Sequence, residues 1–254
     1  MENPARVRVN WKSVGTYYAI ACLWSWPFYW RRDILNVPDT PITSISKLLI
    51  HWGLMWGPGI AALVCMAAFR RSHRRVITLG GNLWGRSILF YAAPFLLLAV
   101  FRAHVLYGYN RPALVAAFPM FVSILGEELG WRGFLQDALR PLSPVKRFVL
   151  IGALWEFWHF TTRTTHGWSP QRIAVTLLIS YSAVILLSFI IGYATERSRS
   201  VMVAVSLHMY IDVLLNNLDL YIPLLLALPI WVWLLLTWPK PTAAQGNVRL
   251  HPIA

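Results

Sequence analysis

Long apolar segments recur along almost the whole of this 254-residue chain, and they constrain its fold more than any other feature. A helix needs about 20 mostly apolar residues to cross a hydrocarbon core of about 30 Å. The sequence therefore predicts an all-α fold, a polytopic membrane bundle of about eight transmembrane helices that forms a single membrane-embedded domain over 1–254. The expected helices lie at 14–30, 48–69, 88–108, 112–139, 148–163, 174–195, 200–217 and 221–238.

The composition leaves no room for a separate soluble domain. Hydrophobic residues make up 57% of the chain and charged residues 13%, whereas about a quarter of the residues of a soluble domain are charged. The first apolar segment lacks a small-residue cleavage site after it, so we expect an anchored span and not a signal peptide. The polar tail at 239–254 is expected to be flexible. Cys22 and Cys65 both lie in apolar segments, which argues against a disulfide or a cysteine zinc site.

The net charge of +13 is explained by membrane topology and does not require a nucleic-acid partner. No block of Lys and Arg with interleaved aromatic residues is present, so binding to nucleic acid is not expected. With the N-terminus in the cytoplasm and Arg132 set aside, the inner segments hold 15 of the 23 Lys and Arg residues and the outer segments 7. This bias favours two cytoplasmic termini and an even number of spans. The expected location is a bacterial inner membrane.

Ionisable residues interrupt three of the expected spans. Each charged group at the middle of a bilayer costs roughly 2.5–3.5 kcal/mol, so several of them cannot face lipid. They must face one another or a water-filled space, and we interpret them as a functional site. They are Glu127, Glu128 and Arg132 in the fourth span, Glu156 and His159 in the fifth, and His208 and Asp212 in the seventh.

Helical spacing assigns different partners to these residues. Glu128 and Arg132 are four residues apart, with the acid first, which is the favourable order for an ion pair on one face. His208 and Asp212 have the same spacing. Glu127 lies about 100° around the helix from Glu128, so the two acids point in different directions. The helical rise also places the polar groups of the three spans at a similar membrane depth.

The three segments resemble the CPBP intramembrane protease family, which includes the CAAX prenyl endopeptidases and their bacterial relatives. The family pattern, Glu-Glu-x-x-x-Arg, Phe-x-x-x-His and His-x-x-x-Asn/Asp on separate helices, is matched over about 112–217. Here the three motifs are Glu127-Glu128-x-x-x-Arg132, Trp155-x-x-x-His159 and His208-x-x-x-Asp212. Two residues depart from the usual pattern. Trp155 replaces a Phe, which an aromatic packing role should tolerate, and Glu156 replaces a small residue.

The residue types suit hydrolysis of a peptide bond, which needs an activated water and a donor to the developing oxyanion. Glu127 and His159 are the candidates for holding and deprotonating the water. His208 is the candidate oxyanion donor, with Asp212 orienting its ring. Glu128 is expected to form a structural ion pair with Arg132. The resemblance implies the same catalytic set and an intramembrane endopeptidase, with no cofactor and no metal expected.

Three alternatives remain open. Zinc could be bound, because Glu and His are zinc ligands, although the chain has no His-Glu-x-x-His motif. A non-catalytic membrane factor of the self-immunity type could use the same polar set to bind a peptide. A proton-coupled transporter could also bury acids and histidines. The expected partners are the lipid bilayer and a peptide or protein substrate that is membrane-bound or lipidated; in a bacterium, a leader peptide or small membrane peptide is the expected substrate.

Overall fold

The computed structural model describes residues 8–30, 45–70, 75–100, 104–105, 111–160, 168–216 and 221–239. Over these residues the chain is almost entirely helical, which confirms the predicted all-α class. The only strands in the described part are two residues long, and β1 (His104–Val105) pairs antiparallel with β2 (Arg111–Pro112). The C-terminal tail beyond 239 lies outside the described residues.

Seven of the eight expected segments coincide with one helix or with consecutive pieces of helix. The third, expected over 88–108, is wrong at its end, because its helix spans Trp84–Val100 and residues 104 and 105 form β1. The sixth is longer than predicted, and the fifth begins earlier and is described as far as residue 160. The helices are α1 (Trp11–Trp30), α2 (Ile45–Met55), α3 (Gly57–Ala68), α4 (Trp84–Val100), α5 (Ala113–Gly130), the π-helix η1 (Trp131–Leu135), α6 (Gln136–Ala138), α7 (Pro144–Trp158), α9 (Pro170–Ser198), α10 (Val201–Asn216) and α11 (Tyr221–Leu236).

Only α9, among the described helices, is by itself long and apolar enough to cross a membrane. The pair α2 and α3 meets the same measure when it is taken as one span. Many large apolar side chains of α9 are exposed, for example Leu178 at 70% and Ile179 at 63%. An apolar surface of this kind is typical of contact with lipid or with another apolar partner.

The second expected span is broken. The sequence predicts a continuous helix over 48–69, but α2 and α3 meet at a bend of 46° around Trp56. Pro58 begins the first turn of α3, where its missing N–H costs no hydrogen bond, and Gly57 precedes it. The break therefore has a local cause in the sequence.

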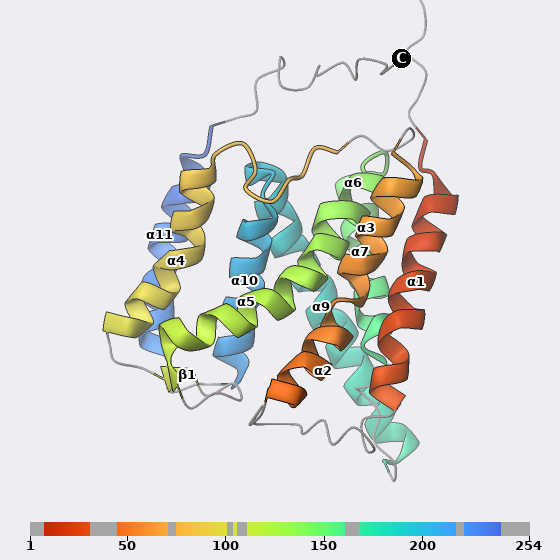
Figure 1. The fold of residues 1–254 in the computed structure, drawn as a ribbon, viewed down its shortest axis with the longest axis horizontal. Helices are drawn as coiled ribbons and strands as arrows, with labels where there is room; N and C mark the ends of the chain where they lie inside the picture. The colour runs from red at the N-terminus through yellow and green to blue at the C-terminus, as the bar shows by residue number, and fades with distance from the viewer. Residues whose placement is uncertain are drawn as a thin grey trace, which may run out of the picture.

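The helix that carries the two adjacent glutamates lies at the centre of the bundle. Figure 1 shows α5 crossing the other helices obliquely, and it packs against α2, α3, α4 and α10. Glycine allows this close packing. A Cβ atom at Gly126 would lie 2.8 Å from the Trp56 side chain, and one at Gly130 would lie 2.6 Å from the Tyr17 hydroxyl. The first helices thus hold α5 in place although they carry no recognised motif.

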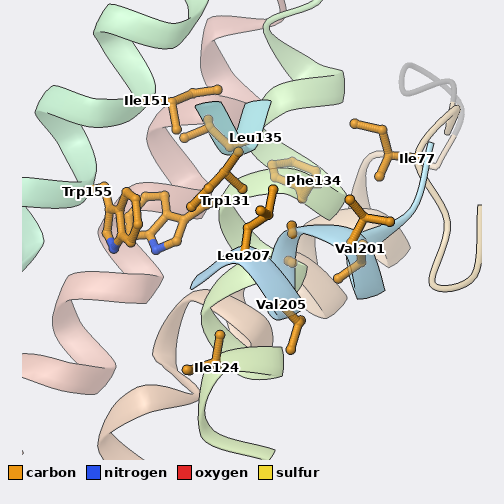
Figure 2. Close-up of a cluster of buried hydrophobic side chains, with 14 of the residues drawn as sticks. Ile77, Ile124, Trp131, Phe134, Leu135, Ile151, Trp155, Val201, Val205 and Leu207 are labelled. Atoms are coloured by element: carbon orange, nitrogen blue, oxygen red, sulfur yellow. The ribbon is translucent and has the colours of Figure 1, made fainter. Parts of the chain in front are cut away.

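A buried apolar cluster surrounds the middle of the bundle (Figure 2). It combines side chains from α5, η1, α7 and α10 with Ile77 from the segment before α4. Trp131, Phe134 and Leu135 of η1 are completely buried in it. A π-helix widens one turn of an otherwise α-helical segment, and such turns are frequent at functional sites. Here the π-turn directly follows the Glu127–Glu128 pair.

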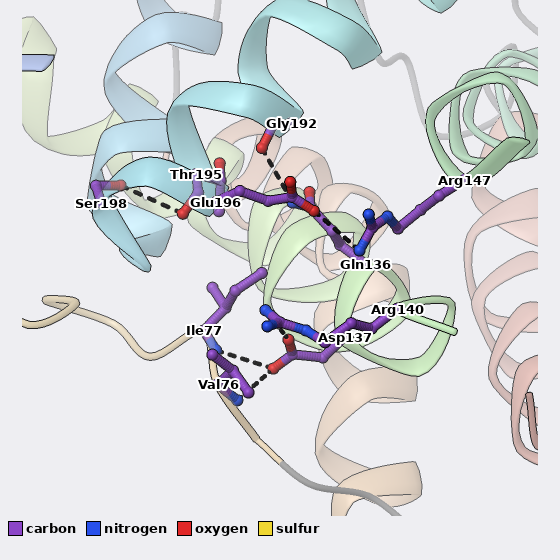
Figure 3. Close-up of polar contacts among 10 residues, drawn as sticks. All are labelled: Val76, Ile77, Gln136, Asp137, Arg140, Arg147, Gly192, Thr195, Glu196 and Ser198. Carbon is purple, nitrogen blue, oxygen red and sulfur yellow. Dashed lines mark hydrogen bonds and ion pairs between the residues drawn. The ribbon is translucent and has the colours of Figure 1, made fainter. Parts of the chain in front are cut away.

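One end of the bundle is tied together by polar contacts (Figure 3). The Asp137 carboxylate accepts hydrogen bonds from the backbone N–H groups of Val76 at 2.7 Å and Ile77 at 2.9 Å. Arg147 forms an ion pair with Glu196 on α9 at 2.9 Å. Three segments that the charge bias assigns to the cytoplasm therefore meet at the same end of the molecule.

Candidate functional site

The buried ionisable residues come from α5, η1, α7 and α10. Glu127, Glu128, Arg132 and His208 are all more than nine-tenths buried. Asp212 has a side chain that is 27% exposed, and it lies one helical turn beyond His208 on α10. The site is therefore closed on the side of the glutamates and more accessible on the side of Asp212.

Glu128 contacts two cationic or polar partners with its two carboxylate oxygens. Its Oε2 lies 3.6 Å from Arg132 Nε, so the predicted spacing of four residues does produce an ion pair. Its Oε1 lies 2.9 Å from His208 Nδ1, within hydrogen-bond distance. The second contact was not anticipated, and it links the ion pair on α5 and η1 to the histidine on α10.

The Arg132 guanidinium is completely buried, and few groups compensate its charge. None of its three nitrogens finds a hydrogen-bond acceptor within the described part of the chain. Its charge is balanced by Glu128 and by the face of the Trp155 ring, whose centroid lies 4.9 Å from Cζ. Buried charge that is partnered in this way is strongly sensitive to loss of the partner.

Glu127 points toward a different partner, as its angular separation from Glu128 predicts. The indole N–H of Trp155 donates a hydrogen bond of 3.0 Å to Glu127 Oε2. The other oxygen, Oε1, is buried and has no hydrogen-bond partner among the described residues. One oxygen of this carboxylate is thus fixed by α7, and the second remains able to accept a proton.

His159 follows the last turn of α7 and is partly exposed. Its Nδ1 lies 3.1 Å from the carbonyl oxygen of Trp155, and a carbonyl can only accept, so Nδ1 carries the proton. In the neutral ring this leaves Nε2 as the acceptor nitrogen. The ring also packs edge-on against Trp158, with centroids 4.7 Å apart.

His208 and Asp212 face each other along α10, although less closely than a hydrogen bond requires. His208 Nε2 and Asp212 Oδ2 are 3.8 Å apart, which permits an electrostatic interaction only. The sequence predicted that Asp212 orients the ring. The shorter contact with the ring is made by Glu128, through Nδ1. Nε2 is consequently the ring nitrogen on the side of Asp212.

The family model described as type II CAAX prenyl endopeptidase Rce1-like matches residues 109–214, which contain all three motifs. Over these residues the chain is similar to the CPBP/CAAX protease family. No curated protein and no solved structure shows significant similarity to the chain. Similarity to this family suggests an integral membrane protein of the protease class.

The sequence pattern of the CAAX protease family did not reveal the part played by Trp155. The sequence assigned it a packing role only, whereas its indole N–H bonds Glu127 and its ring contacts Arg132 and His208. The signal that could have identified it is the replacement of Phe by Trp, whose indole carries an N–H donor that Phe lacks. The second departure, Glu156, is completely buried on the same helix.

The geometry also bears on which residues could hold a metal. Within the described part of the chain, no group of three or more His, Cys, Asp or Glu side chains has an arrangement that could bind a metal ion. Glu127 and Glu128 each already bond a neighbouring side chain.

The different partners of the two glutamates lead to a prediction about stability. Glu128→Ala is expected to lower the free energy of unfolding by about 3–5 kcal/mol, because it leaves Arg132 buried without a counter-charge. Glu127→Ala removes one acceptor from Trp155 and is expected to cost about 1–3 kcal/mol. Thermal unfolding of the two variants in the same detergent measures the difference. Equal melting temperatures would contradict separate roles for the two acids.

Proposed function

We propose that this chain is an intramembrane endopeptidase that hydrolyses a peptide bond with a water molecule activated by Glu127 and His159. The observation that carries the proposal is the state of the Glu127 carboxylate, which has Oε2 bonded by Trp155 while Oε1 has no partner among the described residues. A general base needs an acceptor oxygen of this kind within reach of the water. Similarity to the CAAX protease family supports the reaction class.

The proposed reaction begins with transfer of a proton from water to Glu127 as the water oxygen attacks the peptide carbonyl carbon. His159 Nε2 accepts the second hydrogen bond of the water and so helps to orient it. The tetrahedral intermediate then collapses, the C–N bond breaks, and Glu127 returns the proton to the leaving amine. The base that accepts the proton is thus also the acid that releases it.

In this proposal His208 stabilises the oxyanion of the intermediate. Its Nδ1 already faces Glu128, so Nε2 is the nitrogen that faces the substrate. Donation from both nitrogens requires the doubly protonated ring. Carboxylates lie on either side of that ring, Glu128 at 2.9 Å from Nδ1 and Asp212 at 3.8 Å from Nε2. Donors that are fixed in place before the charge develops are among the largest contributors to catalysis.

We propose a peptide or protein substrate that is membrane-bound or lipidated, in keeping with the substrates named in the description of the matched family. The direct experiment is mass spectrometry of peptides released from a membrane proteome by the purified protein, with the Glu127→Gln protein as the control. New cleavage products from the parent alone would support the proposal. Retention of intact peptides without cleavage would instead indicate a peptide-binding factor of the self-immunity type.

The same assay tests the proposal that no metal takes part. The water is then activated by Glu127 and His159 directly, so cleavage should continue after exhaustive chelation. Support for this form comes from Glu128, whose two carboxylate oxygens already face Arg132 and His208. Activity that is lost to a chelator and restored by zinc would indicate the zinc-dependent form of the protease.

We further propose eight spans in a bacterial inner membrane, with both termini in the cytoplasm. Support comes from the polar end of the bundle, where the segments around Val76, Arg147 and Ser200 meet. Single cysteines introduced near each terminus, in a protein whose two buried native cysteines are replaced, should react only from the cytoplasmic side. A C-terminal tail that is labelled only from the outside would contradict this topology.

A further inference from the structure

Trp155 lies where the three helices of the candidate site meet. Its side chain is 2% exposed, and its indole N–H donates to Glu127 Oε2 on α5 at 3.0 Å. Its ring packs edge-on against His208 of α10, with centroids 5.0 Å apart and an angle of 76° between the planes. The Arg132 guanidinium lies against the same ring. One side chain from α7 therefore contacts the proposed base, the proposed oxyanion donor and the buried cation.

The indole hydrogen bond makes the two oxygens of Glu127 unequal. The terminal torsion of a glutamate side chain has broad, roughly two-fold preferences, so a free carboxylate does not present one particular oxygen. Here Oε2 is bonded across the helix interface, whereas Oε1 has no partner among the described residues. The bond thus selects the oxygen that can accept a proton and fixes the plane in which it lies.

The backbone carbonyl of Trp155 contacts His159, the second residue proposed to hold the water. The Trp155 carbonyl accepts from His159 Nδ1 at 3.1 Å, which assigns the ring proton to Nδ1. Glu127 and His159 are consequently oriented by one residue, the first through the side chain and the second through the main chain. Any aromatic residue would supply the carbonyl, but only tryptophan supplies an indole N–H.

We propose that Trp155 is a positioning residue whose indole N–H holds Glu127 so that Oε1 receives the proton of the attacking water. This inference rests on the proposed function. Phe, the residue that the motif of the CAAX proteases leads one to expect here, could pack in the same place but could not donate the bond. The chain thus adds a support for its base that the motif itself does not contain.

Trp155→Phe tests the proposal because it keeps an aromatic ring and removes only the indole N–H and the second ring. We expect kcat to fall about tenfold or more, as for loss of a hydrogen bond to a charged group, with KM within about twofold of the parent. Trp231→Phe is the matched control. Trp231 is also 2% exposed, and its indole N–H donates to the Phe90 carbonyl at 2.7 Å. The control should keep the parent kcat even if it unfolds at a lower temperature.

Infrared spectroscopy provides a second measurement that does not require cleavage. The carboxyl band of Glu127 is assigned by its disappearance in Glu127→Gln. In samples acidified until Glu127 is protonated, the C=O band of Trp155→Phe should lie at higher frequency than that of the parent because the carbonyl loses a hydrogen-bond donor, and Trp231→Phe should leave it unchanged. An unchanged band in Trp155→Phe, or a kcat equal to that of the parent, would overturn the positioning role. If the band shifts in Trp155→Phe but the parent protein cleaves no peptide, the positioning role stands and the proposed function is overturned.

Discussion

Glu127→Gln is expected to reduce peptide cleavage by about 10²–10⁴-fold, the usual contribution of a general base. Glutamine is nearly the same size and keeps an oxygen that can accept the Trp155 N–H, so the contact across the α5–α7 interface survives in a weaker form. It cannot take a proton from water. The measurement is the initial rate on one cleavable peptide, together with the unfolding temperature in the same detergent.

Glu196→Gln is the matched control for this change. Glu196 belongs to the polar end of the bundle, where it pairs with Arg147 at 2.9 Å (Figure 3). Its conversion to glutamine should lower stability slightly and leave the cleavage rate unchanged. A Glu127→Gln protein that cleaves as fast as the parent would show that another group, with His159 the first candidate, is the base.

The helical pattern was predictable because it depends on local properties of the chain. Apolar segments of sufficient length predict helices wherever they occur, and the described helices overlap the expected segments, apart from the end of the third, where residues 104 and 105 form β1. The Glu128–Arg132 ion pair was predictable for the same reason, since four residues of helix fix its geometry. The different directions of Glu127 and Glu128 also follow from helical rotation alone. Each of these inferences requires only one helix.

The features that the sequence did not predict depend on which helices are neighbours. The 2.9 Å contact between Glu128 and His208 joins residues that are 80 positions apart, and helical spacing carries no information about such a pair. The indole bond from Trp155 to Glu127 is of the same kind. A pattern of residue types can predict that the polar groups of these helices lie at a similar membrane depth. It cannot show which oxygen faces which nitrogen.

The bend in the second expected span was missed for a different reason. Trp56, Gly57 and Pro58 are compatible with a helix by hydropathy, and a proline in the first turn of a helix is well tolerated. The bend places Trp56 and Pro58 against Gly126 and Gly130 of α5, where any side chain on those glycines would clash. Gly126 and Gly130 frame the glutamate pair, so packing of a segment without a motif determines where the candidate base lies.

A large effect is expected on α10 from Asp212, which lies beside the proposed oxyanion donor His208. Its carboxylate lies 3.8 Å from His208 Nε2, the ring nitrogen that is proposed to donate to the oxyanion while Nδ1 is held by Glu128. Its side chain is also more exposed than those of the buried glutamates, which places it at the accessible edge of the site. Asp212→Ala is therefore expected to reduce cleavage by about 10²–10³-fold, the loss typical of an oxyanion donor or its support.

Asp212→Asn separates two ways in which this residue could act. Asparagine removes the negative charge but supplies N–H donors in a side chain of nearly equal size. If Asp212 donates to the oxyanion as a neutral acid, Asn should restore most of the activity that Ala loses. If its charge instead supports a doubly protonated His208, Asn should be nearly as slow as Ala. The measurement is the cleavage rate of the three proteins on one peptide. If Ala matched the parent, Asp212 would be a packing residue and the oxyanion would have to form away from His208 Nε2.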